Sequence, residues 1–310
     1  TVGFRGQGDH AFWDDDPSKN TDQARGAFIS SIIRRQMELV RENDPDAVFC
    51  TYLYGEMMPL YRQGYLEIPD EVIKIWSDNG FGKMVSRRQE LFNPRTDAMP
   101  APNEAGANGI YYHAGFYDLQ AANHITMLQV PMPLVVEELK TVLAHGGDQC
   151  WIINSGSIRP HLYPLEVIRR MWTDGDCDPE RTAAEYAQTY YGSAAAGTLL
   201  TAYGAASVAY GPHDDDRAGD QFYHFPIREM ANALTRGKNP VKKISWVATE
   251  DSFDAQAAHL CRITLPGCTS WRKYVEQCRA AEKNLTGACL QAFRDGPLTA
   301  GQIHHHGCES

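Results

Sequence analysis

Short, unbroken apolar runs alternate with helix-length segments through the first half of the chain. The runs 47–52, 72–76, 110–113 and 150–154 are of strand length, and Val2–Arg5 resembles the end of a further strand. Strands that are apolar on both faces are typical of a parallel sheet covered by helices. The pattern therefore predicts an α/β fold with about five βα units.

The segments between these runs carry apolar residues at helical spacing, which predicts helices at 21–43, 55–63, 134–143 and 165–172. A (β/α)8 barrel of the TIM type needs eight such units. Either the sheet is open and doubly wound, or the first barrel units lie outside this chain. Because the sequence begins abruptly in a strand-like segment, we expect the second arrangement, with only the later βα units present.

The character of the sequence changes near Cys177, after which no strand-like alternation stands out. Helices are predicted at 179–191, 194–209, 226–235, 254–261 and 269–292. We therefore predict two domains, a partial catalytic barrel over 1–175 and an all-α helical bundle over 176–310. The run His304-His305-His306 is expected to lie in a solvated tail.

Composition excludes several classes of function. The formal net charge of −10 disfavours binding to nucleic acid, and no run approaches the roughly 20 apolar residues of a membrane span. None of the eight cysteines forms a CxxC pair, so we expect no metal site of that kind. The sequence leaves open whether the late cysteines form disulfides. The run Asp14-Asp15-Asp16 is expected in a solvated loop, with calcium binding as the minor alternative.

Polar and aromatic side chains follow each predicted strand. In parallel α/β folds the site lies beyond the carboxyl ends of the strands, so these side chains should converge. Aromatic faces, amides, guanidinium groups and carboxylates together are what a sugar-binding site needs. The candidates for substrate binding are Arg5, Asp9, Trp76, Tyr112, His113, Asn154 and Arg159.

Three carboxylates are candidates for acid–base chemistry, and each has a simpler structural interpretation. Asp78 follows an apolar strand but could instead cap its own turn. Glu56 could interact with the amino end of a helix, and Glu104 stands in the long loop 97–108. Arg5 could pair with Asp9, although a guanidinium also matches a uronate carboxylate in bidentate fashion.

Four of these strand-end segments resemble glycoside hydrolase family 115. Gly3-Phe4-Arg5-Gly6-Gln7-Gly8-Asp9 is similar to the family's GxRGDGD, and Gly109-Ile110-Tyr111-Tyr112-His113 to its G-V-Y-Y-H. The segment from Trp76 to Gly82 is similar to W-x-D-D-N-x-G, and that from Trp151 to Pro160 to W-I-x-N-V-G-D-x-K-P. The four motifs stand in the family's order within residues 1–172.

The resemblance implies an α-glucuronidase that removes (4-O-methyl)glucuronic acid side chains from xylan or a related glycan by an inverting mechanism without a cofactor. It implies Asp78 as the base, Glu104 or Glu56 as the acid, and a secreted or periplasmic protein. Asn79, Ser157 and the segment 123–126 depart from the family's motifs. A glycosidase for another sugar and a non-catalytic carbohydrate-binding relative therefore stay as alternatives, and a homodimer stays open.

Overall fold

A four-stranded parallel sheet forms the centre of the first half of the protein. The computed structural model describes residues 1–6, 10–86, 95–116, 120–238, 240–242 and 244–310. The strands follow one another in the order β1-β2-β3-β4. They are β1 (Phe49–Leu53), β2 (Val72–Ser77), β3 (Asn108–His113) and β4 (Cys150–Asn154). Because all neighbours are parallel, the carboxyl ends of the four strands lie at one edge.

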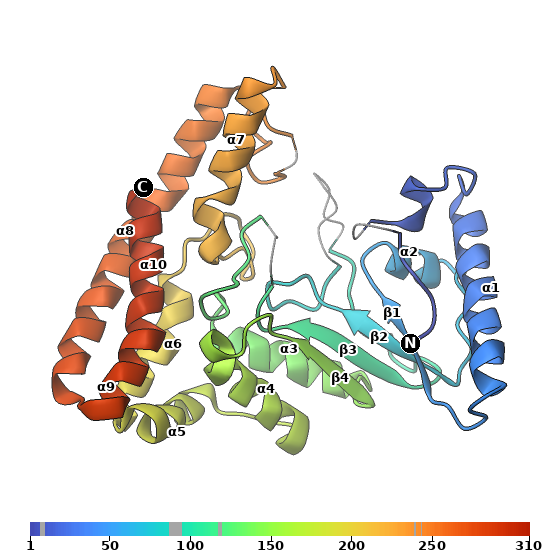
Figure 1. Cartoon of the computed structure of the whole chain (residues 1–310), viewed down its shortest axis with the longest axis horizontal. Coiled ribbons are helices and arrows are strands. Elements are labelled where there is room, and N and C mark those ends of the chain that lie inside the picture. The colour runs from blue at the N-terminus through green and yellow to red at the C-terminus, as the bar shows by residue number, and fades with distance from the viewer. Residues whose placement is uncertain (7–9, 87–94, 117–119, 239, 243) are drawn as a thin grey trace.

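Helices α1 (Asp22–Arg41), α2 (Met57–Arg62), α3 (Met132–Ala144) and α4 (Leu162–Asp174) accompany the sheet. The Thr21 hydroxyl accepts a hydrogen bond from the backbone N–H of Ala24, which caps the start of α1. Helix α1 stands at the β1 end of the molecule, and α3 and α4 lie side by side below the sheet in the view of Figure 1. The predicted parallel α/β arrangement is thus confirmed.

One detail of the sheet differs from the sequence interpretation. Val2–Arg5 is not a strand: the Val2 N–H bonds to the Cys50 carbonyl at 2.8 Å, but Gly3 has φ +87°, outside strand geometry. The described residues therefore contain four strands in one sheet instead of five. An eight-stranded barrel stays a prediction.

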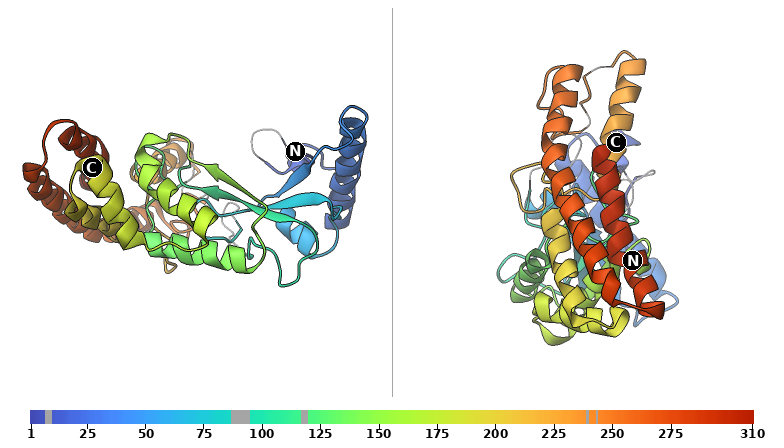
Figure 2. Two further views of the ribbon diagram at one scale, coloured as in Figure 1. Left: turned by 90° about the horizontal axis from the view of Figure 1, so that it is seen from below. Right: turned by 90° about the vertical axis from the view of Figure 1, so that its left-hand side faces the viewer.

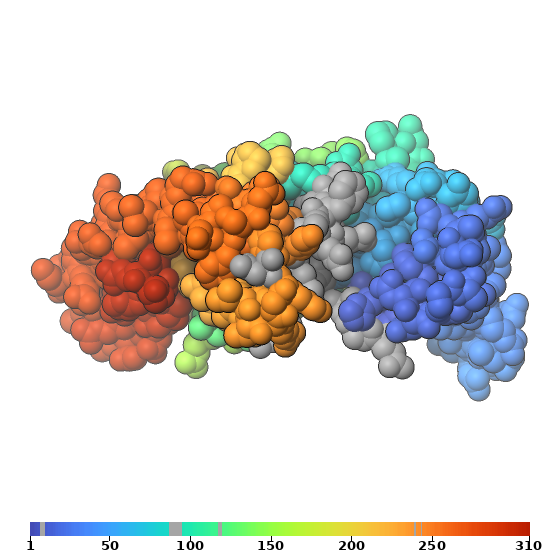
Figure 3. Space-filling view, turned by 90° about the horizontal axis from the view of Figure 1, so that it is seen from above, coloured from blue at the N-terminus to red at the C-terminus, as the bar shows by residue number. Residues whose placement is uncertain are grey.

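The second half is helical. Its helices are α5 (Pro179–Tyr191), α6 (Gly197–Ala206), α7 (Phe225–Thr235), α8 (Phe253–Ala281), α9 (Gly287–Phe293) and α10 (Thr299–Glu309). Helices α6, α8 and α10 run side by side (Figure 2). Seen from the α7 side, this helical region and the N-terminal segment occupy opposite ends of the molecule (Figure 3). The division into two domains at residue 176 stays a prediction.

Two predictions about the helical region are corrected. The two helices expected at 254–261 and 269–292 merge largely into α8, which contains Pro266. The expected solvated tail is instead α10, in which His304 is fully buried. Its ring stacks on Trp271 with centroids 4.3 Å apart, so aromatic packing fixes the last helix on α8.

Buried carboxylates connect the helical region to the loops of the sheet. Asp215 accepts a hydrogen bond from the Asn79 amide at 2.7 Å and pairs with Arg95. Asp220 accepts backbone N–H groups of His124, Ile125 and Thr126 with one oxygen. These contacts hold the loops after β2 and β3 against the later helices.

All eight cysteines are free thiols, so the structure contains none of the disulfides that the sequence left open. Among the described residues, none of the helices combines the length and apolar character needed to cross a lipid bilayer.

Burial makes His304 a determinant of acid stability. Its nitrogens lie 2.7 Å from the Tyr203 hydroxyl and 3.0 Å from the Tyr223 hydroxyl, and burial lowers the pKa of His304 to about 4. The folded pKa lies below the usual value of about 6.5. The contribution of neutral His304 to the free energy of unfolding is therefore fully present above pH 6.5 and decreases as the pH falls toward 4. We expect this one group to lower the free energy of unfolding by about 2 kcal/mol between pH 7.5 and 5.

The measurement is urea unfolding at both pH values for the parent and for His304→Gln, whose amide can still hydrogen-bond but does not titrate. The variant should lose less stability on acidification. Equal pH dependence in the two proteins would contradict the role of His304. Burial also lowers the pKa of His161 to about 4, so part of the acid sensitivity should persist in the variant.

Candidate functional site

A cavity of about 410 Å³ opens at the carboxyl ends of the strands. Its volume lies within the roughly 300–1,000 Å³ range of small-molecule sites. The polar and aromatic side chains that line it come from the N-terminal segment, from β1, from β3 and the loop after it, and from β4. They include Arg5, Tyr52, Tyr54, Tyr111, Phe116 and Asn154.

Arg5 and Glu56 form the charged part of this site. The Arg5 Nε lies 2.5 Å from one Glu56 carboxylate oxygen, and Nη2 lies 3.2 Å from the other. The guanidinium also lies over the Tyr54 ring, 4.4 Å from its centroid. Glu56 is the residue before α2 and stands three residues after the end of β1. Two elements thus bring a cation and a carboxylate together, and the cation lines the cavity.

Three tyrosines and one amide form the uncharged wall. The Tyr111 ring packs edge-on against Tyr52 with centroids 5.6 Å apart, and its hydroxyl accepts a hydrogen bond from the Asn154 amide at 2.7 Å. Burial is the main cause of the raised pKa of Tyr52, so this phenol stays protonated at neutral pH. The wall offers apolar ring surfaces together with hydroxyl and amide groups, which suits the two surfaces of a sugar.

Asp78 and His113 form a buried pair beside this wall. One carboxylate oxygen of Asp78 contacts the His113 Nδ1, and the other accepts the His113 backbone N–H at 3.2 Å. Both side chains are almost completely buried. The His113 Nε2 has no hydrogen-bond partner within the described part of the chain. The carboxylate therefore favours the tautomer with the proton on Nδ1, which leaves Nε2 as an acceptor.

The ring of His113 lies immediately behind the cavity. Its centroid is 4.6 Å from that of Tyr111 and 4.2 Å from that of Phe116, and both of these rings line the cavity. The Asp78–His113 pair is thus one aromatic layer away from the space that a ligand would occupy.

Asn79 explains one departure from the family motif. Its amide oxygen accepts the Phe81 N–H at 2.9 Å, and its amide nitrogen donates to Asp215 at 2.7 Å. An aspartate here would place a second carboxylate against buried Asp215 and would have no N–H to donate. In this chain position 79 therefore shapes the turn after β2 and connects it to the helical region.

Other residues predicted for the site lie elsewhere. Trp76 is fully buried in the core, where its indole N–H donates to the Asn108 side chain at 3.0 Å. Tyr112 is also fully buried, with its hydroxyl on the Gly82 carbonyl at 2.9 Å. Arg159 lines a separate cavity of about 470 Å³ together with Tyr163. Asp9 lies outside the described residues.

Glu104 contacts two residues of α2 and lies at the edge of the sheet opposite the carboxyl ends of the strands. Its carboxylate contacts the Tyr61 hydroxyl and lies 3.5 Å from the Arg62 guanidinium. Burial, followed by the hydrogen bond to Glu104, raises the pKa of Tyr61 above its usual range. Arg62 ends α2, and Glu104 stands four residues before the start of β3, so this carboxylate lies near the amino ends of the strands.

We therefore expect Glu104→Gln to change stability without changing turnover. Loss of the charged interactions in a nearly buried position should lower the free energy of unfolding by about 1–3 kcal/mol. Denaturant unfolding and steady-state kinetics on the same preparation would check this. A large decrease in kcat at unchanged folding would restore Glu104 as a candidate acid.

Strand alternation could have identified the tyrosines of the cavity. Adjacent residues of a strand point to opposite faces, so only one of Tyr111 and Tyr112 can face the site. The structure directs Tyr111 to the cavity and Tyr112 to the core. Tyr52 in β1 and Tyr54 just after it are two residues apart, and both line the cavity.

Comparisons with known proteins identify the family of the chain. The family model for glycosyl hydrolase family 115 matches residues 1–209. The chain belongs to this family, as its strand-end motifs predicted. No curated protein matches the chain.

Among solved structures, the chain is similar to BtGH115A, a family GH115 4-O-methyl-α-glucuronidase with specificity for decorated arabinogalactans. The TM-score is 0.61 at 16% sequence identity, and the match covers 99% of this chain and 37% of that protein. At this identity the similarity concerns the fold, and the chain spans little more than a third of the length of the protein it resembles.

Proposed function

We propose that this chain supplies the sugar-binding face of an α-glucuronidase that removes (4-O-methyl)glucuronic acid side chains from xylan or a related glycan. The observation that carries the proposal is the 410 Å³ cavity in which Arg5 meets three tyrosines and Asn154. A guanidinium next to aromatic rings and an amide suits a sugar that bears a carboxylate. On this proposal the four parallel strands and the helices beside them belong to a (β/α)8 barrel.

A uronate can exchange with Glu56 at Arg5. The Arg5 guanidinium, which lines the cavity, pairs with Glu56 behind it, and a substrate carboxylate would compete for the same donors. Glu56 would then be released from the guanidinium. Glu56 is therefore our candidate for the general acid that donates to the leaving oxygen.

Asp78 and His113 are our candidates for the general base of an inverting reaction. In such a reaction a base activates water on the opposite face of the sugar, and the acid and base groups lie roughly 6.5–9.5 Å apart in two-carboxylate enzymes. Asp78 would orient His113, whose Nε2 would accept the proton of the water. Because the pair lies behind Tyr111 and Phe116, this step requires substrate binding to displace the Phe116 ring.

The direct test is hydrolysis of glucuronoxylan, of decorated arabinogalactan and of an aryl α-glucuronide, with release of the uronic acid measured. NMR of the released sugar at early times should show inversion at the anomeric carbon. Retention would exclude the inverting mechanism. Hydrolysis of neutral aryl glycosides at equal or higher rates would exclude a uronate-specific site.

Burial of Asp78 and His113 favours one second candidate, a carbohydrate-binding relative without hydrolytic activity. Its expected signature is calorimetric binding of glucuronic acid with no turnover of any of the three substrates. In that outcome the assignment of Arg5 and Asn154 to sugar binding stands, and the assignment of Glu56 and Asp78 to catalysis does not.

A further inference from the structure

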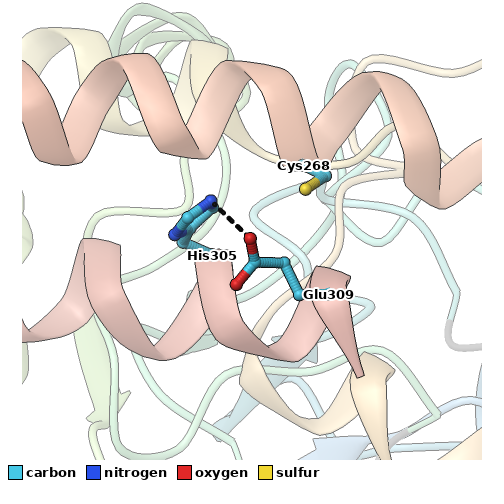
Figure 4. Close-up of side chains that lie close together, drawn as sticks. All are labelled: Cys268, His305 and Glu309. Carbon is cyan, nitrogen blue, oxygen red and sulfur yellow. Dashed lines mark ion pairs between the residues drawn. The ribbon is translucent and has the colours of Figure 1, made fainter.

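Three potential metal ligands meet between the last helix and α8, far along the chain from the cavity. His305 and Glu309 stand one turn apart on α10, and Cys268 faces them from α8 (Figure 4). The ligand atoms of the three side chains all lie within 4.8 Å of one another. The His305 Nε2 is 3.4 Å from the nearer Glu309 oxygen. One thiol, one imidazole and one carboxylate thus point to a common volume.

Packing between the two helices fixes this geometry. Trp271 follows Cys268 by three residues and stacks on His304, the neighbour of His305, with 8° between the ring planes. Gly301 lets α10 approach closely, because a Cβ there would lie 2.7 Å from the Tyr274 ring. The backbones that carry the three ligands are therefore held in register before any ion binds, which lowers the ordering cost of binding.

The His305 ring contacts Glu309 but makes no hydrogen bond through Nε2 to any described residue. The His305 Nε2 is buried, and the described residues offer it no hydrogen bond. Leaving a buried polar atom unsatisfied is unfavourable, and a metal ion would satisfy it. A neutral imidazole nitrogen of this kind is the commonest metal ligand in proteins.

Arg272 supplies positive charge at the same place. Its Nη2 lies 3.8 Å from the Cys268 sulfur and 3.9 Å from a Glu309 oxygen. The side chain is 55% exposed, so it can leave toward solvent when another cation arrives. The arrangement already pairs a cation with the thiol and the carboxylate, and Arg272 would compete with a metal ion for them.

We propose that Cys268, His305 and Glu309 bind a divalent ion of the zinc class, with water as the fourth ligand. Thiolate and imidazole together select borderline ions such as Zn²⁺ over Mg²⁺ and Ca²⁺. Tetrahedral zinc with bonds of about 2.0–2.3 Å places its ligand atoms about 3.3–3.7 Å apart, so the present cluster must contract by about 1 Å. The bound ion would fasten α10 to α8.

The charges of this site balance. Binding releases the thiol proton of Cys268 to solvent, and the resulting thiolate and the Glu309 carboxylate together neutralise the two positive charges of the ion. No redox step is involved. The site is independent of the cavity and of the proposed glycosidase activity.

The test is calorimetric titration of the whole chain with ZnCl₂ in the presence of a non-chelating reductant. We expect one ion per chain in the parent, and affinity lower by about 100-fold or more in Cys268→Ala and in His305→Ala. Cys261→Ala removes an exposed thiol of the same helix and should bind as the parent does. Arg272→Gln should bind several-fold more tightly, because the competing cation is gone.

Co²⁺ gives a readout that depends on the sulfur. The parent should show a thiolate-to-Co²⁺ charge-transfer band that is absent from Cys268→Ala and present in Cys261→Ala. Saturating Zn²⁺ should also raise the Tm of the parent and not that of His305→Ala. The proposal is overturned if no ion binds, if binding survives both ligand substitutions, or if the Co²⁺ complex lacks the thiolate band.

Discussion

Replacing Asp78 with asparagine should lower kcat by about 10³-fold while leaving KM nearly unchanged. The carboxylate holds His113 through Nδ1 and through its backbone N–H, and it does not line the cavity. An amide at this position can donate to Nδ1 and so favour the tautomer with the proton on Nε2, which cannot accept a proton from water. Substrate contacts at Arg5 and Asn154 would remain.

The control for this prediction is Asp220→Asn, which alters another buried carboxylate that accepts backbone N–H groups. It should lower stability and leave kcat within a few-fold of the parent. Kinetics are measured well below each Tm, with folding checked by circular dichroism. If Asp78→Asn loses activity only in proportion to its unfolded fraction, Asp78 has a structural role alone.

His113→Gln separates the two possible bases. A loss as large as that of Asp78→Asn would mean that the pair acts as one unit through Nε2. If the loss is tenfold or less, Asp78 would have to act on water directly, and the role assigned to His113 would be abandoned.

Arg5→Met should weaken binding of glucuronic acid by about 100-fold and change binding of glucose by less than twofold. The guanidinium lies over Tyr54 at the cavity and holds Glu56 with two nitrogens. Hydrogen bonds between charged partners contribute about 1.5–3 kcal/mol each, and only the uronic acid has the carboxylate to make them. Calorimetry with the two sugars measures the difference directly.

Arg5→Lys is the matched variant. It keeps the charge and loses the planar fork, so it should recover part of the affinity for the uronate. Because Arg5 also neutralises Glu56, the Met variant needs a folding check, and Arg5→Met combined with Glu56→Gln removes both charges together. If Arg5→Met and Arg5→Lys both bind glucuronic acid as tightly as the parent, the uronate site lies elsewhere.

The sequence predicted the sheet well because its strands are short and apolar, with helices before β1 and after β1, β3 and β4. Apolar strands of this kind have few alternative structures, and β2, β3 and β4 lie within one or two residues of the expected bounds. The same pattern identified the edge of the sheet at which polar groups gather. It also led to the strand-end motifs through which the family was recognised.

The selection among neighbouring strand-end residues was harder to predict. Trp76 and Tyr112 belong to the same motifs as Asp78 and Tyr111, yet both face the core. A motif gives residue types in order, whereas the pleat of each strand and its neighbours decide which side chain points to the cavity. Glu104 shows the same limit, because the path of a long loop determines where its carboxylate lies.

The sequence alone determined the parallel sheet, the helical second half and the family, since these depend on local hydrophobic periodicity and on residues close in the chain. Only the tertiary structure decided that Arg5 meets Glu56, that Asp78 meets His113 and that Cys268 meets His305. Each of these pairs joins residues 35 or more positions apart. Such contacts depend on how whole helices and strands pack, which local sequence patterns do not specify.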